Sequence, residues 1–266
     1  MTLVMGAVAG VMGSTLGIGG GVFLVPFLVL VLGLPFKAAA AVSLMAVIAT
    51  SSSVSAATTG RHLINLRLGM VLEVATAAGG LLGGLTAQML SASTLQFLFA
   101  ILGLTVAVTL FRKAGHDEPR ADCDGDIGVL GGRYEDDKGL SVCYRVKHLP
   151  LGLVASFVAG NVSTLLGVGG GIIKVPVLAT VCGVPVRAAA ATSAFMIGVT
   201  ATSGAVIYYG HGHLVPALAA AAVVGTQAGS AAGLHLTRRA HPRRLRLLLA
   251  SVLGIVALVM LERALV

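Results

Sequence analysis

The chain has 266 residues, of which 56% are hydrophobic and only 11% are charged, with a formal net charge of +8. Soluble domains carry about 25% charged residues, so this composition excludes a soluble globular protein and predicts an integral membrane protein. Apolar stretches much longer than ten residues favour helices over barrel strands, which would alternate with a period of two. The basic residues flank apolar segments without interleaved aromatic residues, which fits contact with a lipid bilayer and argues against nucleic acid as a partner.

Breaks at charged residues, proline and glycine divide the chain into ten apolar segments, five on each side of a polar stretch. The segments are 2–16, 22–34, 38–60, 68–90, 94–111, 149–166, 172–183, 188–209, 214–236 and 246–262. We therefore expect an all-α integral membrane protein with about ten transmembrane or re-entrant helices. Segment 22–34 would give a helix of about 20 Å, against a hydrocarbon core of about 30 Å. The first two helices of each half either span fully or form a re-entrant hairpin.

The two halves repeat each other at an offset of 150 residues. The motif GIGGG at 17–21 corresponds to GVGGG at 167–171, and each is followed by a proline, a lysine or arginine, and a run of four alanines. A slightly shorter offset then aligns Gly79 with Gly225 and Gly83 with Gly229. Self-similarity at a fixed offset indicates an internal duplication.

The segment count predicts the orientation of the two repeats, 1–111 and 149–266. Five crossings in each repeat place equivalent points on opposite faces, which gives inverted topology. Counted over short loops, eight basic residues fall on one face and only Lys37 and Arg263 on the other. The positive-inside rule then places the first face in the cytoplasm and both termini outside.

The polar stretch at 112–148 holds eight of the ten carboxylates and is expected to be a cytoplasmic loop between the repeats. Within it, GRYEDDKGLSVCYRV at 132–146 has two short runs around Lys138 and Gly139. This pattern predicts a small β-hairpin.

The two glycine motifs interrupt apolar helices, where non-helical backbone is tolerated only if it is buried in protein or lines a cavity. Successive glycines can present N–H groups to an anion at the start of the following helix. The other interpretation is that the glycines permit tight helix packing. Because the motif is duplicated, we favour a substrate-binding loop in each half, formed by Gly19, Gly20 and Gly21 and by Gly169, Gly170 and Gly171.

Hydroxyl residues recur at spacings of seven and three on one face of the helix that follows each glycine loop. They are Ser43, Thr50 and Ser53 in the first half and Ser193, Thr200 and Ser203 in the second. Such hydroxyls can bond to the preceding turn or hold helices together. Matching polar stripes in both halves are also what a substrate path requires.

Two charged residues lie inside apolar segments. Lys174 stands where the first half has Leu24, three residues after Gly171, and its charge could neutralise a bound anion. The alternative is a lysine that extends to the lipid headgroups. We expect Glu73 to be an interfacial cap residue rather than a proton carrier.

Other features predict structure rather than chemistry. Glycines four residues apart indicate close helix packing and are compatible with a homodimer. The histidines and cysteines lack metal-ligand spacing, and no nucleophile–base motif is present, so we expect no metal, no cofactor and no enzymatic activity.

These motifs resemble the sulfite exporter TauE/SafE family of bacterial transporters. The matching residues are GIGGGVFLVPFLV with KAAAAVSLMAVIATSS, and GVGGGIIKVPVLA with RAAAATSAFMIGVTATS. The resemblance implies an all-helical transporter of small sulfur-containing anions or organosulfonates, with two related halves, in a bacterial inner membrane.

We therefore expect a secondary transporter, more specifically an exporter, that binds sulfite or an organosulfonate between the two glycine loops and works by alternating access. A proton or sodium ion is a plausible coupling ion. The alternatives are a passive anion channel, a transporter of another small anion and a metal-cation transporter. The scarcity of intramembrane carboxylates weighs against the last of these.

Overall fold

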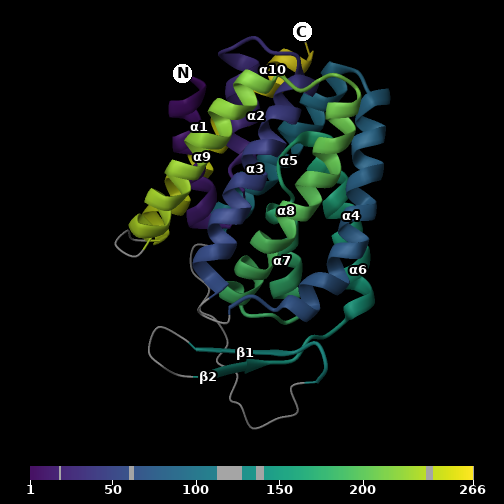
Figure 1. Cartoon of the computed structure of the whole chain (residues 1–266), viewed down its shortest axis with the longest axis vertical. Helices are drawn as coiled ribbons and strands as arrows, with labels where there is room; N and C mark the ends of the chain where they lie inside the picture. The colour runs from purple at the N-terminus through teal and green to yellow at the C-terminus, as the bar shows by residue number, and fades with distance from the viewer. Residues whose placement is uncertain (18, 60–62, 113–127, 136–140, 238–241, 266) are drawn as a thin grey trace.

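The computed structural model describes residues 1–17, 19–59, 63–112, 128–135, 141–237 and 242–265, which form ten helices and one β-hairpin (Figure 1). The helices of the first half are α1 (Thr2–Leu16), α2 (Gly21–Leu30), α3 (Phe36–Thr59), α4 (Leu66–Met89) and α5 (Ala92–Arg112). Those of the second half are α6 (Leu149–Leu166), α7 (Gly171–Thr180), α8 (Val186–Gly210), α9 (Pro216–Thr237) and α10 (Pro242–Leu265). Each of the ten predicted apolar segments is confirmed as a helix.

Among the described residues, six helices are long and apolar enough to cross a membrane: α3, α4, α5, α6, α8 and α9. Large apolar side chains point outward from them, including Val74, which is 75% exposed, and Val206, which is 61% exposed. Extended apolar surface of this kind is unfavourable in water and favourable against lipid tails. The chain is a multi-pass membrane protein.

The first two helices of each half form a helical hairpin, in which the second helix is short. In the second half, the amide of Lys147, just before α6, donates to the carbonyl of Cys182, just after α7, at 3.0 Å. Both open ends of the α6–α7 hairpin therefore lie at one end of the molecule. The α1 and α2 helices lie in the opposite half of the molecule from the β-hairpin, whereas α7 lies in the half nearest to it (Figure 1).

Most of the helix packing joins one half of the chain to the other. Helix α1 lies against α9, α4 against α6, α3 against α8, and α5 against α10. Gly79 of α4 lies against the backbone of Phe157, and Gly229 of α9 lies against the backbone of Ala7. Since Ala7 and Phe157 are themselves 150 residues apart, Gly79 corresponds to Gly229 and not to Gly225. The predicted shorter offset is wrong, and the offset of 150 holds through α4 and α9.

The predicted β-hairpin is confirmed by strands β1 (Gly132–Glu135) and β2 (Ser141–Tyr144), which pair antiparallel with Gly132 opposite Tyr144. The expected turn at Lys138 and Gly139 lies outside the described residues. Tyr134 and Tyr144 are buried in an apolar cluster with residues of three helices. The helix residues of that cluster include Leu68 and Leu72 of α4, Leu178 of α7, and Ala188, Ala189 and Met196 of α8.

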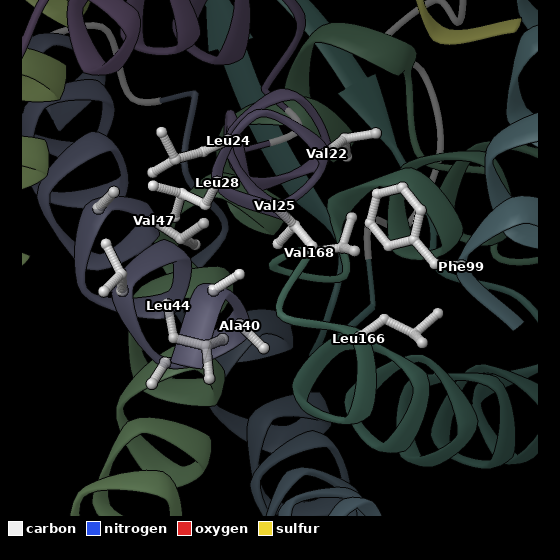
Figure 2. Close-up of a cluster of buried hydrophobic side chains, with 14 of the residues drawn as sticks. Val22, Leu24, Val25, Leu28, Ala40, Leu44, Val47, Phe99, Leu166 and Val168 are labelled. Carbon is white, nitrogen blue, oxygen red and sulfur yellow. The ribbon is translucent and has the colours of Figure 1, made fainter. Parts of the chain in front are cut away.

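The main core surrounds α2 and the middle of α3. Figure 2 shows side chains of α2, among them Val25 and Leu28, facing Leu44 and Val47 of α3. Val168 and Leu166 of the second half close the cluster from the other side. The start of the second glycine loop is thus packed into the core of the first half.

Candidate functional site

The segments 17–21 and 167–171, hereafter the first and second glycine loops, have nearly the same backbone conformation. Positive φ angles occur at the same three positions in each loop. They are 67°, 93° and 70° at Gly17, Gly19 and Gly20, and 72°, 88° and 71° at Gly167, Gly169 and Gly170. Residues with a Cβ rarely adopt this conformation, which explains why glycines stand there. The first glycine of each loop ends the preceding helix as a left-handed cap.

Both glycine loops lie midway along the spanning helices. A Cβ atom built on Gly19 would lie 3.2 Å from Val47 and 3.5 Å from Ile197, and one built on Gly169 would lie 2.8 Å and 3.2 Å from the same side chains. Val47 is near the centre of α3, and Ile197 is near the centre of α8. The two loops therefore meet around one pair of equivalent residues at mid-depth of the helix bundle.

Each glycine loop also packs on a helix of the other half. Gly17 lies against Ala190 of α8, and Gly167 lies against Ala40 of α3. Ser43 of α3 donates a hydrogen bond to the carbonyl of Gly167 at 2.7 Å. Ser43, predicted as a site residue, thus ties the first half to the second glycine loop.

Ser193 occupies the equivalent position to Ser43 but is bonded differently. Its side chain is fully buried on α8, and its hydroxyl oxygen has no hydrogen-bond partner among the described residues. The hydroxyl of Ser163, close to Gly170, is likewise buried without a partner in that part of the chain. Buried hydroxyls without partners are uncommon, because each loses its hydrogen bonds to water. Ser163 gives the second glycine loop unused hydrogen-bonding capacity, and Ser193 gives α8 the same.

Lys174 is the central side chain of a buried polar cluster one turn beyond the second glycine loop. Its Nζ donates to Thr200 Oγ1 at 2.8 Å and lies 3.7 Å from Glu73 Oε2. Thr200 Oγ1 in turn donates to Glu73 Oε1 at 2.8 Å. Only 1% of the Lys174 side chain is exposed, so the structure rules out a lysine that extends to the headgroups.

Glu73 is the member of this buried cluster that the sequence interpretation did not assign to the site. It is the eighth residue of α4, whereas Asn65 is the N-cap and accepts a hydrogen bond from the amide of Leu68. Its side chain is only 9% exposed and makes an ion pair. The expectation of an interfacial cap residue is therefore wrong. A lone carboxylate two turns inside an apolar segment was the signal that could have identified it.

The remaining predicted hydroxyls lie farther from the loops or bond locally. Thr50 donates to Ala46 of its own helix at 3.0 Å and lines a small cavity of about 10 Å³ with Gly17 and Gly19. Ser53 donates to Gln227 of α9 at 2.9 Å, and Ser203 donates to the carbonyl of Thr200 at 2.7 Å. The structure brings Ser43 and Thr50 near the loops and Thr200 into the ion pair, buries Ser193 on α8, and places Ser53 toward α9.

The ion pair has no counterpart at the equivalent site around the first glycine loop. At an offset of 150, Lys174 corresponds to Leu24, Glu73 to Val223 and Thr200 to Thr50. Val223 instead lines an open groove of about 470 Å³ between α3 and α9, together with Ser52 and Gln227. The two sites share the glycine loop and the threonine, and only the site formed by α4, α7 and α8 carries charge.

No group of three or more potential metal ligands occurs among the described residues. What the bundle does contain is a pair of broken helices meeting at mid-depth, beside a buried lysine–glutamate pair. Intramembrane charges of this kind face a substrate or ion pathway, and discontinuous helices at the bilayer midplane are typical of secondary transporters. The fold and the site define the class of multi-pass membrane transport proteins.

The family model described as sulfite exporter TauE/SafE matches residues 2–260, and the chain belongs to this family. The chain is 26% identical over 258 residues to "Probable membrane transporter protein YunE" of Bacillus subtilis, covering 94% of this chain and 93% of that protein. It is 26% identical over 280 residues to "Probable membrane transporter protein MJ0441" of Methanocaldococcus jannaschii, with 98% and 94% coverage. No solved structure matches the chain. The protein is a membrane transporter and not an enzyme.

Proposed function

We propose that this protein is a secondary transporter that exports small sulfur-containing anions, such as sulfite or organosulfonates, by alternating access. The observation that carries the proposal is the buried ammonium group of Lys174. The amide of Lys174 donates to the carbonyl of Gly170 at 3.1 Å, so the side chain arises from the turn that follows the second glycine loop. A positive charge at this depth is costly unless an anionic group faces it.

The glycine loops supply the rest of the proposed anion site. They end at the N-termini of α2 and α7, where the helix dipole is positive and amide groups have no acceptor within the helix. Among the described residues, the amides of Gly169 and Gly170 donate to no acceptor. With the hydroxyls of Ser163 and Ser193, they offer hydrogen-bond donors for the oxygens of a sulfite or sulfonate group.

Anion entry requires the two loops to separate. Gly21 lies against the carbonyl oxygen of Gly167, and the cavity beside the first loop has room for about one water molecule. A sulfite ion is larger than that. The open ends of the α1–α2 and α6–α7 hairpins lie toward opposite ends of the molecule. Relative movement of the two halves would therefore expose the loops to each side in turn.

The proposed orientation follows from the distribution of charge. We place the two repeats with inverted topology in a bacterial inner membrane, with the end that carries the β-hairpin in the cytoplasm and both termini outside. Arg67 and Arg187 lie at the ends of α4 and α8 that adjoin the β-hairpin, and Lys37 and Arg263 lie at the other end. This distribution agrees with the positive-inside rule.

Flux measurements on purified protein in liposomes test this function. Radiolabelled sulfite, thiosulfate, sulfate and methanesulfonate are offered in turn, with empty liposomes as the control. We expect protein-dependent flux that saturates for at least one sulfur-containing anion and is competed by the others. No flux or binding for any of them would overturn the proposed substrate, and flux that does not saturate would indicate a passive channel.

A further inference from the structure

We propose that Glu73 is the coupling residue of the transporter and carries a proton together with each anion, so that export takes place when the outward gradient of the anion exceeds the inward gradient of protons. On this proposal, which rests on the function proposed above, protonation of Glu73 frees Lys174 to bind the anion. The coupling ion is then a proton and not sodium. Four independent features of the site support this inference.

The first feature is the geometry of the pair, which is held through a hydroxyl group. Lys174 and Glu73 are 3.7 Å apart, longer than a direct hydrogen bond, and Thr200 bridges them with two bonds of 2.8 Å. Glu73 Oε2 has no hydrogen-bond partner among the described residues. This oxygen can take up a proton without breaking a bond, and the ammonium group retains donors for a second ligand.

The second feature is the isolation of the pair from other charges. Glu73 and Lys174 are the only charged residues with buried side chains in the part of the chain that the structure describes. The helices that pack against α4 are α6, which has no acidic or basic residue, and α8, whose one such residue, Arg187, lies at its N-terminal end. Lys174 is thus the charged group that faces Glu73, and any change in the charge of one residue acts directly on the other.

The third feature is the charge balance of the site. Without substrate, the ammonium of Lys174 and the carboxylate of Glu73 sum to zero. If a monovalent anion enters alone, the site carries a net negative charge in a medium of low dielectric constant, which is strongly unfavourable. If a proton from solution adds to Glu73 Oε2 and the anion pairs with Lys174, which stays protonated, the loaded site is again neutral. The empty site and the loaded site are then both neutral, and both can undergo the conformational change of alternating access.

The fourth feature is the equivalent site around the first glycine loop, which shows what the site looks like without coupling groups. It keeps the glycine loop and Thr50 but has Leu24 and Val223 in place of Lys174 and Glu73. The fold therefore does not need the charges to form a glycine loop between two broken helices. Their presence at only one of the two equivalent sites indicates a functional rather than an architectural role.

The test uses proteoliposomes with an imposed pH difference, labelled methanesulfonate and sulfite as substrates, and a pH-sensitive dye inside. Methanesulfonate is a monoanion throughout the pH range, so its own charge does not change with pH. For wild type we expect accumulation of about tenfold per unit of pH difference, because one pH unit equals a tenfold ratio for a proton that moves with each anion. The dye should report a proton entering with the anion, and a potassium diffusion potential should leave the accumulation unchanged.

Glu73→Gln separates coupling from binding. This variant keeps the hydrogen bond from Thr200 but cannot be charged, and we expect it to exchange labelled anion while losing the pH-driven accumulation. The matched control is Glu262→Gln, since Glu262 is an exposed carboxylate near the end of α10 and should behave as wild type.

The outcomes distinguish this inference from the proposed function. Wild-type anion flux that is independent of the pH difference, or that moves no proton, would overturn the coupling role and leave the transporter intact. So would a Glu73→Gln protein that still accumulates anion. A wild type that moves neither anion would overturn both. If Glu73→Gln does not fold, the wild-type dye measurement alone decides.

Discussion

Lys174 and Glu73 are the two residues in which the charged site departs most from the equivalent site around the first glycine loop. Removing one member of a buried ion pair leaves an uncompensated charge, at a cost of about 3–5 kcal/mol, whereas replacing both with apolar residues is often neutral. The chain itself offers the apolar replacement, because Leu24 and Val223 occupy the equivalent positions.

The double variant Glu73→Val/Lys174→Leu should therefore be stable. We expect each single variant to lower the midpoint of thermal unfolding in detergent by several degrees, and the double variant to recover most of that loss. A double variant that is less stable than both single variants would show that the pair is needed for folding.

Ser43 makes the hydrogen bond that ties α3 to the second glycine loop. Ser43→Ala leaves the buried carbonyl of Gly167 without this donor, which costs about 1–3 kcal/mol. We expect a lower unfolding midpoint and weaker anion binding. The control is Ser52→Ala, because Ser52 is exposed and bonds only to Ile48 of its own helix. Equal effects of the two substitutions would contradict the role of Ser43.

At the residue scale, the sequence singled out Lys174 and the hydroxyl residues as candidate site residues but did not identify Glu73 as the partner of Lys174. Glu73 and Lys174 are separated by a hundred residues, and hydropathy alone does not say which face of α4 turns toward α7. A residue's depth along a helix can be counted from the sequence, but its partner on another helix depends on packing. The same holds for Ser53, whose spacing matches Thr50 but whose hydroxyl bonds to Gln227.

At the scale of elements, hydropathy was sufficient for all ten helices, and two short runs around a lysine–glycine turn were sufficient for the hairpin. The offset of α9 was misjudged by one turn for a physical reason. Gly225, Gly229 and Gly233 are spaced by four residues, so a shift of one helical turn matches glycine to glycine equally well. Only the contacts with Ala7 and Phe157 identify the correct register.

The packing of α4 against α6 depends on Gly79, which touches the backbone of Phe157. Gly79→Leu should force the two helices apart. The lost packing should destabilise the fold by several kcal/mol and so reduce the amount of folded protein recovered in detergent. Ala78→Leu is the control, because Ala78 is exposed on the same helix. If the two variants are recovered in equal amounts, Gly79 is not a packing contact.

At the scale of the whole molecule, the arrangement predicts opposite accessibility of the two ends. Single cysteines at Val129, beside the β-hairpin, and at Arg263, near the end of α10, are introduced into a cysteine-free background. A thiol reagent that does not cross membranes should label Arg263→Cys from outside intact cells and Val129→Cys only after the membrane is opened. Labelling of both from the same side would contradict the proposed topology.

The central claim is that the anion binds to Lys174 between the two halves. Equilibrium binding of labelled methanesulfonate and sulfite to purified protein tests it directly, with the double variant Glu73→Val/Lys174→Leu as the folded, uncharged site and Lys37→Met as the control for loss of a lysine. We predict saturable binding by wild type and by Lys37→Met, and at least about a tenfold loss of affinity in the double variant, since a charge-assisted contact contributes about 1.5–3 kcal/mol. A folded double variant that binds either anion as tightly as wild type would contradict the account.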